Sequence, residues 1–313
     1  MTIAYASGKA ILFGEHAVVY GRPAIAVPVT QVRARATVEA GGPGIAIVAP
    51  DLNRRYLVDQ VPTDDPLAHA VRITLAHLGL SLDQNLTITV ASTIPLARGL
   101  GSSAAISAAL VRALARHFGR DLPPEEVSVL VYETEVIHHG TPSGIDNTVV
   151  AYEQPVYFVR GQPIERLRVG APLRLAIADT GIASSTREVV GDVRRAWERD
   201  RARYERLFDQ IGEIARRARR AIEGGELEVL GRLLDENHGL LQAMGVSSPE
   251  LDGLAEAARA AGALGAKLSG AGRGGNMIAL IQPEMRAKVA EALREAGAAS
   301  VILTEVPPAD GAD

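Results

Sequence analysis

The sequence predicts an α+β protein, and three observations support this class. Its 313 residues fit two domains or one large one. Strand-like runs dominate the first part of the chain, whereas long helical patterns follow residue 185. The end of the chain reads strand, glycine loop, strand, helix, strand, so the order is not the regular strand–helix alternation of α/β proteins.

Short apolar or alternating runs bounded by turn residues predict the strands of the first part. They are Ala10–Phe13, Ala24–Val29, Arg33–Glu39, Gly44–Val48, Leu86–Ala91, Thr148–Val150 and Val156–Arg160. Helical spacing, with proline or serine at the start, predicts three helices. They are Pro66–Leu78, Ser102–Phe118 and Pro123–His138.

A domain boundary is predicted near Gly161–Pro172, where glycine, proline and charged residues concentrate. It divides the chain into an N-terminal domain, 1–165, and a C-terminal domain, 166–313. In the second domain we expect strands at Leu173–Ala178, Ala266–Leu268, Met277–Ile281 and Ser300–Glu305. The expected helices are Ser185–Glu223, Leu227–Met244, Pro249–Gly262 and Glu284–Ala296.

The composition excludes several classes of protein. Hydrophobic residues make up 47% and charged residues 22%, which is typical of a packed globular protein. The absence of cysteine excludes disulfides, thiolate metal sites and a cysteine nucleophile. The arginines of 194–220 are interleaved with acids, which indicates a solvated helix face and argues against nucleic-acid binding. With no apolar run of membrane-spanning length, we expect no membrane association and a cytoplasmic location.

The most informative segment is Pro95–Leu110, PLARGLGSSAAISAAL. A glycine loop that opens into a helix presents free backbone N–H groups at the positive end of the helix dipole, and this arrangement binds anions. Ser102 or Ser103 can cap the helix, and a hydroxyl there can reach a phosphate-bound metal. The loop lacks the Lys-Ser/Thr ending of a Walker A motif. A nucleotide site and a plain serine-capped turn both remain open from this segment alone.

A second cluster of chemically active residues is KAILFGEHAVVYG, Lys9–Gly21. Lys9 opens an apolar run that ends in Glu15 and His16. A lysine can neutralise phosphate or lower the pKa of a reacting hydroxyl, and Glu15 and His16 can contact hydroxyls of a polar ligand. The alternative is a surface lysine beside a turn.

A third cluster of chemically active residues is ETEVIHHGTPSGIDN, Glu133–Asn147. Glu135 and Asp146 flank a chain reversal, so both carboxylates could approach one site, where one could hold Mg²⁺ and the other accept a hydroxyl proton. His138 and His139 lack a convincing set of zinc partners, so capping of the helix C-terminus is favoured for them.

A fourth segment is KLSGAGRGGNM, Lys267–Met277. Its four glycines lie between two apolar runs, so the backbone could approach a ligand closely. A glycine-rich hairpin turn explains the segment equally well.

Taken together, the four segments resemble the GHMP kinase superfamily. Its three ordered motifs match Lys9–Val29, Pro95–Ala105 and Lys267–Gly275, which together span nearly the whole chain. The segment His139–Asn147 is most similar to members that phosphorylate mevalonate. The resemblance implies an N-terminal domain like ribosomal protein S5 domain 2, a ferredoxin-like C-terminal domain with extra helices, and an active site between them.

The resemblance also implies roles for individual residues. Asp146 matches the catalytic base, and Lys9 matches the lysine that lowers the pKa of the substrate hydroxyl. Ser103 and Glu135 match the Mg²⁺ ligands. The ATP phosphate loop matches Pro95, Arg98, Gly99, Leu100, Gly101, Ser102, Ser103 and Ala104. The substrate-side positions match Glu15, His16, Ser143, Gly144, Thr180, Gly270 and Ala271.

The expected reaction is therefore transfer of the γ-phosphoryl group of ATP to the 5-hydroxyl of mevalonate, with Mg²⁺ as cofactor. The expected assembly is a homodimer. A GHMP kinase for phosphomevalonate, homoserine or a sugar is the alternative within the family. An inactive metabolite-binding regulator on the same fold is a further alternative, although the presence of Lys9 and Asp146 argues against it.

Overall fold

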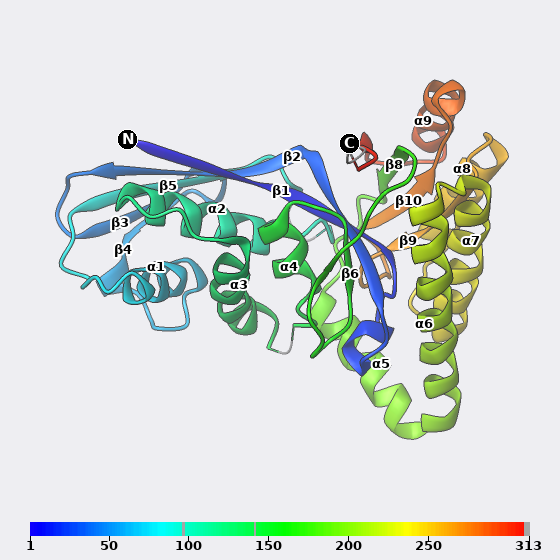
Figure 1. The fold of residues 1–313 in the computed structure, drawn as a ribbon, viewed down its shortest axis with the longest axis horizontal. Helices are drawn as coiled ribbons and strands as arrows, with labels where there is room; N and C mark the ends of the chain where they lie inside the picture. Colours follow the sequence, from blue (N-terminus) through cyan, green and yellow to red (C-terminus); the bar gives the residue numbers. More distant parts are fainter. Residues whose placement is uncertain (96–97, 141, 310–313) are drawn as a thin grey trace. The chain divides into compact units, whose positions relative to one another are not determined.

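The computed structural model describes residues 1–95, 98–140 and 142–309 (Figure 1). The chain forms two compact units, each assembled from separate stretches. The first comprises Met1–Gly8, Val32–Pro95 and Gly101–Glu153. The second comprises Lys9–Gln31, 98–100 and 154–309 among the described residues. The predicted domains, 1–165 and 166–313, are continuous in sequence, whereas these two units are defined by contacts and are discontinuous. The domain boundary stays a prediction.

The first unit contains a sheet whose strands lie in the order β4-β3-β5-β2. The strands are β4 (Arg54–Leu57), β3 (Ile45–Ala49), β5 (Leu86–Ser92) and β2 (Ala24–Ala40), of which only the C-terminal part belongs here. β3 and β5 are parallel, and β2 is antiparallel to β5. Val38, Ile88 and Ile47 are paired across neighbouring strands and are fully buried, so the alternating pattern gives one apolar face.

Four helices complete this unit: α1 (Pro66–His77), α2 (Ser102–His117), α3 (Pro124–His139) and α4 (Ile145–Tyr152). The alanine-rich α2 packs on β5 and contacts the other three helices. Its small buried side chains allow the neighbouring helices to approach closely. The predicted strand Thr148–Val150 is wrong, because these residues are buried in α4. Packing overrides the strand preference of three consecutive residues that are all β-branched.

The second unit contains an antiparallel sheet in the order β11-β8-β10-β9. Its strands are β11 (Ser300–Val306), β8 (Leu173–Asp179), β10 (Asn276–Leu280) and β9 (Gly265–Ser269). The pairing places Asp179, Asn276 and Ser269 in one row at the end of the sheet. The strands β1 (Thr2–Phe13) and β2 each contain a boundary between the two units. The short strands β6 (Val156–Phe158) and β7 (Glu165–Arg166) pair with each other, and β6 pairs with the start of β2.

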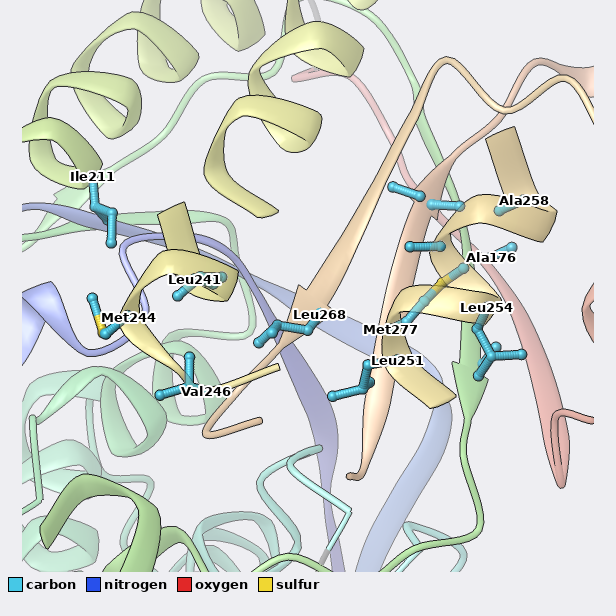
Figure 2. Packing of buried hydrophobic residues seen from close by; sticks show 14 of the residues in the cluster. Ala176, Ile211, Leu241, Met244, Val246, Leu251, Leu254, Ala258, Leu268 and Met277 are labelled. Carbon is cyan, nitrogen blue, oxygen red and sulfur yellow. The ribbon is translucent and has the colours of Figure 1, made fainter. Parts of the chain in front are cut away.

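Helices cover this sheet, and the side chains between the helices and the strands form the hydrophobic core. α8 (Pro249–Ala260), α9 (Arg286–Glu295) and α7 (Leu227–Met244) pack on the strands, and α6 (Arg201–Gly224) packs along α7. Figure 2 shows Leu268 and Met277 gathered with Leu251 and Leu254 of α8, and all four are buried. The short 3₁₀ helices are η1 (Ala17–Tyr20), η2 (Pro50–Leu52), η3 (Val58–Gln60) and η4 (Pro283–Met285).

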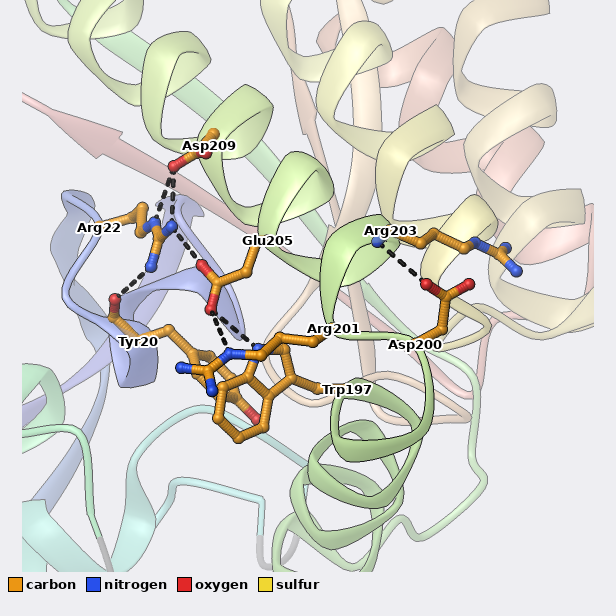
Figure 3. Close-up of polar contacts among 8 residues, drawn as sticks. All are labelled: Tyr20, Arg22, Trp197, Asp200, Arg201, Arg203, Glu205 and Asp209. Carbon is orange, nitrogen blue, oxygen red and sulfur yellow. Dashed lines mark hydrogen bonds and ion pairs between the residues drawn. The ribbon is translucent and has the colours of Figure 1, made fainter.

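The predicted single helix Ser185–Glu223 is two helices, α5 (Thr186–Arg199) and α6. Asp200 breaks the helix, because its carboxylate accepts a hydrogen bond from the backbone N–H of Arg203 and caps α6 (Figure 3). Beside this break, Arg22 forms ion pairs with Glu205 and Asp209 of α6. The residues that follow β1 are thereby fixed to α6.

The structure also differs from the sequence prediction in its strands. β2 is one continuous strand, whereas the sequence predicts two separate strands, Ala24–Val29 and Arg33–Glu39, which are its two ends. The short strands β4 and β7 were not predicted, since neither has the four to eight alternating residues on which a strand prediction depends. No helix among the described residues has both the length and the apolar character needed to cross a membrane.

Candidate active site

The glycine–serine loop leads into α2 as the sequence predicts, but the helix cap differs. Gly101 is the N-cap, with φ 72°, and no side chain caps the helix, so the expectation that Ser102 or Ser103 is the cap is wrong. Both serines lie in the first turn. The first helical hydrogen bond runs from Ala105 N–H to the Gly101 carbonyl, so the N–H groups before Ala105 have no acceptor within the helix. This helix start is suited to bind an anion.

Glu135 lies on the face of α3 that meets α4. The residue is 2% exposed, whereas Glu133, which lies on a different side of the helix, is exposed. α2 and α3 pack together and are joined by a short connection, residues 118–123, so they run antiparallel. The first turn of α2, with Ser103, and the last turns of α3, with Glu135, therefore lie at the same end of the helix pair.

Asp146 is held by the docking of α4 on α3. The amide of its neighbour Asn147 donates to the carbonyl and hydroxyl oxygens of Ser128, at 3.1 and 2.9 Å. Ser128 is seven residues before Glu135, so both lie on one face of α3. The first turn of α4, which contains Asp146, is thus fixed on the face that carries Glu135. Ser143 and Gly144 precede this turn, and Gly144 is its N-cap with φ 95°. The side chains of His138 and His139 lie outside the described part of the structure, so their predicted capping role stays a prediction.

In the second unit, Glu15 and His16 are buried after the end of β1. Gly14 is required here, since a Cβ at this position would lie 2.5 Å from the Ala24 backbone, and its φ is 97°. His16 has a φ of 60°, a conformation that non-glycine residues rarely adopt. Its Nε2 lies 2.9 Å from the carbonyl oxygen of Ala271, so Nε2 is the protonated nitrogen and Nδ1 the acceptor. Burial lowers the pKa of His16 to about 4, and the imidazole is neutral near pH 7.

The carboxylate of Glu15 is engaged on both oxygens. Oε1 forms an ion pair with the ammonium of Lys267, and Oε2 accepts a hydrogen bond from the amide of Asn237 at 3.3 Å. The side chains of Lys267 and Glu15 are 0% and 1% exposed. Burial lowers the pKa of Lys267, and the Glu15 carboxylate opposes this shift. Sequence reasoning missed this partner, although Lys267 is the first residue of the fourth segment.

The glycine loop Gly270–Gly275 is fixed by several backbone contacts. Gly272 has no room for a side chain, because a Cβ would lie 1.9 Å from the Val246 carbonyl oxygen. The hydroxyl of Thr180 donates to the Gly275 carbonyl at 3.0 Å. Arg273 is exposed and forms an ion pair with Asp192 of α5. The Arg273 guanidinium holds the pKa of Asp192 below its usual range.

Lys9 is buried in β1, and its backbone N–H donates to the Leu100 carbonyl at 3.0 Å. Lys9 is thereby fixed to the residue that precedes Gly101. Lys9 belongs to the second unit and Asp146 to the first, so their predicted cooperation at the substrate hydroxyl stays a prediction.

A helix start with free N–H groups beside buried carboxylates is typical of proteins that bind phosphate groups, and comparisons with known proteins identify the family. The GHMP kinases N terminal domain matches residues 66–154, and the GHMP kinases C terminal domain matches residues 218–299. The chain therefore belongs to the GHMP kinases, as the sequence motifs predict, and its fold is the two-domain GHMP kinase fold.

Individual relatives show which members of the family this chain is similar to. The mevalonate kinase of Thermococcus sibiricus is 37% identical over 322 residues, covering 96% of this chain and 95% of that protein. The structure of L. major mevalonate kinase in complex with R-mevalonate is 31% identical, with a TM-score of 0.85 and coverage of 99% and 97%. Streptococcus pneumoniae phosphomevalonate kinase has a TM-score of 0.86 at 17% identity, covering 98% of this chain and 100% of that one. The fold is thus common to kinases with different substrates, and the higher identity lies with mevalonate kinases.

Proposed function

We propose that this chain transfers the γ-phosphoryl group of ATP to the 5-hydroxyl of mevalonate, giving 5-phosphomevalonate and ADP, a step of isoprenoid biosynthesis. The observation that carries the proposal is the grouping of Ser103, Glu135 and Asp146 on three mutually packed helices, one of which begins as an anion site. The identity to mevalonate kinases supports the choice of mevalonate. We also infer a cytoplasmic location and keep the homodimer as a prediction.

Each of these residues has a different role in phosphoryl transfer. The backbone binds the phosphates of ATP, through the free N–H groups at Ser102–Ala104 and the main chain of the preceding loop, Pro95 and Arg98–Gly101. Asp146 accepts the proton of the attacking hydroxyl, and Lys9 lowers the pKa of that hydroxyl. The neutral His16, whose Nδ1 is a hydrogen-bond acceptor, contacts the substrate together with the other substrate-side residues. These are Ser143, Gly144, Thr180, Gly270 and Ala271. Glu15 is proposed for this pocket as well, although Lys267 and Asn237 already engage its carboxylate.

Mg²⁺ fits the residues present. A serine hydroxyl and a buried carboxylate are oxygen donors, which Mg²⁺ prefers, and substrate phosphates usually complete its coordination. Among the described residues no group of three or more histidine, aspartate and glutamate side chains could hold a metal by itself. Ser103 and Glu135 would hold the ion. When bound, it neutralises charge on the phosphates.

The acceptor is tested by measuring ADP release from Mg-ATP in the presence of mevalonate, phosphomevalonate, homoserine or galactose. We expect turnover with mevalonate and at least about a hundredfold lower kcat/KM for the others, because each lacks or adds a polar group that the pocket must match. A preference for homoserine, phosphomevalonate or galactose would overturn the assignment of the acceptor. Nucleotide binding without turnover of any acceptor would favour the inactive regulator.

Replacing Ser103 with alanine should raise the KM for Mg-ATP about tenfold or more, because loss of a metal contact commonly costs that much. The KM for mevalonate should stay within about twofold. Titration with Mg²⁺ at fixed ATP should show a matching rise in the metal concentration needed. Ser107→Ala, one turn further along α2 and buried, is the control. A larger effect on mevalonate than on Mg-ATP would refute the metal role of Ser103.

A further inference from the structure

The phosphate loop is attached to the end of the β8–β10–β9 sheet through Arg98. The Asn276 amide donates to the Arg98 carbonyl, and the Arg98 Nε lies 3.5 Å from the Asp179 Oδ2. Both side chains of this ion pair are largely buried, with exposed fractions of 22% and 9%. Asp179 and Asn276 are direct partners in the β8–β10 pairing, so one row of the sheet binds both the backbone and the side chain of Arg98.

The rest of this loop segment packs against the glycine loop. A Cβ on Gly275 would lie 3.1 Å from the Arg98 carbonyl oxygen, which is tighter than ordinary contact, and one on Gly99 would be in ordinary contact, 3.6 Å from the Ser269 carbonyl oxygen. The Leu100 carbonyl accepts the N–H of Lys9. Residues 98–100 are therefore held directly before Gly101, where the anion site begins.

Asp179 is itself oriented. Its Oδ1 accepts the N–H of Gly181 at 2.9 Å, which leaves Oδ2 directed at Arg98. The next residue, Thr180, donates its N–H to the Gly275 carbonyl at 2.9 Å. The carboxylate thus has a fixed position relative to the glycine loop, and it can fix the arginine in turn.

We propose that Arg98 is a positioning residue, whose ion pair with Asp179 holds the phosphate loop in its nucleotide-binding conformation. This inference rests on the proposed function. It assigns the Arg98 Nε a partner in the protein, while the buried Nη1 has no hydrogen-bond partner among the described residues. An arginine in a phosphate loop would ordinarily be interpreted as a phosphate ligand. The direction of its guanidinium toward a buried carboxylate supports the positioning role.

The test is calorimetric binding of Mg-ADP, which requires no acceptor. Arg98→Met and Asp179→Asn should each weaken binding about tenfold, because a charge-assisted contact that fixes the loop is lost in both. The double variant should be no weaker than either single variant, since both remove the same pair. Arg98→Lys, which keeps the charge, should recover part of the affinity.

Arg174→Met is the matched control, because it removes an ion pair with Glu305 at the opposite end of the same strand, β8. It should leave Mg-ADP binding unchanged. Hydrogen exchange at the amides of residues 98–104 should increase in Arg98→Met and Asp179→Asn and not in the control. A direct phosphate contact would instead make Arg98→Met weak while Asp179→Asn bound normally, and this result would overturn the proposal. Failure of the unaltered protein to bind Mg-ADP would overturn the proposed function as well.

Discussion

Asp146→Asn should lower kcat about a thousandfold, because the carboxylate that accepts the hydroxyl proton is replaced by an amide that cannot. The geometry makes this variant informative. Asn147, next to Asp146, anchors α4 on Ser128, so an amide at position 146 leaves the docking of the helix intact. The loss should therefore appear in the chemical step. Pre-steady-state measurement of phosphoryl transfer with mevalonate and Mg-ATP would show it directly.

Mg-ADP binding and thermal stability should change little in the same variant. Glu133→Gln is the control, since it removes an exposed carboxylate from α3 near Glu135 without touching the site. It should retain the full kcat. An Asp146→Asn variant that kept more than about a tenth of the activity would exclude Asp146 as the base, since general-base catalysis contributes at least a hundredfold.

The parts of the site that could be predicted from the sequence are those that depend on a few neighbouring residues. Glycines beside serines, followed by an alanine-rich run, predict a loop that opens into a helix, and α2 begins at Ser102 as expected. Glu135, which the sequence singles out, is buried on α3, and Glu133, two residues earlier, lies on a different side of the helix and is exposed. The choice between Gly101 and a serine as the cap could not be made, because both glycine and serine are accepted at N-caps.

Contacts between distant segments could not be predicted. Glu15 and Lys267 are 252 residues apart in sequence, and no spacing rule connects them. Arg98 and Asp179 are likewise joined only by the fold. The break at Asp200 was missed for a different reason. The surrounding residues continue the helical charge pattern on both sides, and aspartate serves equally as a helix surface residue and as a cap.

The buried pair of Glu15 and Lys267 leads to the largest expected effect on stability. Lys267→Met should lower the free energy of unfolding by about 3–5 kcal/mol, because it leaves the Glu15 carboxylate buried without its cation. Within the described part of the chain, Asn237 would remain as the hydrogen-bond donor to that carboxylate. Denaturant unfolding followed through Trp197, the one tryptophan of the chain, would measure the loss.

Arg217→Met removes an ion pair with Glu236 in which both side chains are more than 40% exposed, so it should cost less than about 1 kcal/mol. The double variant Glu15→Gln with Lys267→Met then decides what Glu15 does. If its carboxylate serves only to pair Lys267, the double variant should regain much of the stability and bind mevalonate with nearly normal affinity, because no charge is left buried. If Glu15 also contacts the substrate, stability should return while the KM for mevalonate stays high. An unchanged stability in Lys267→Met would show that the pair does not hold the segment after β1 to β9.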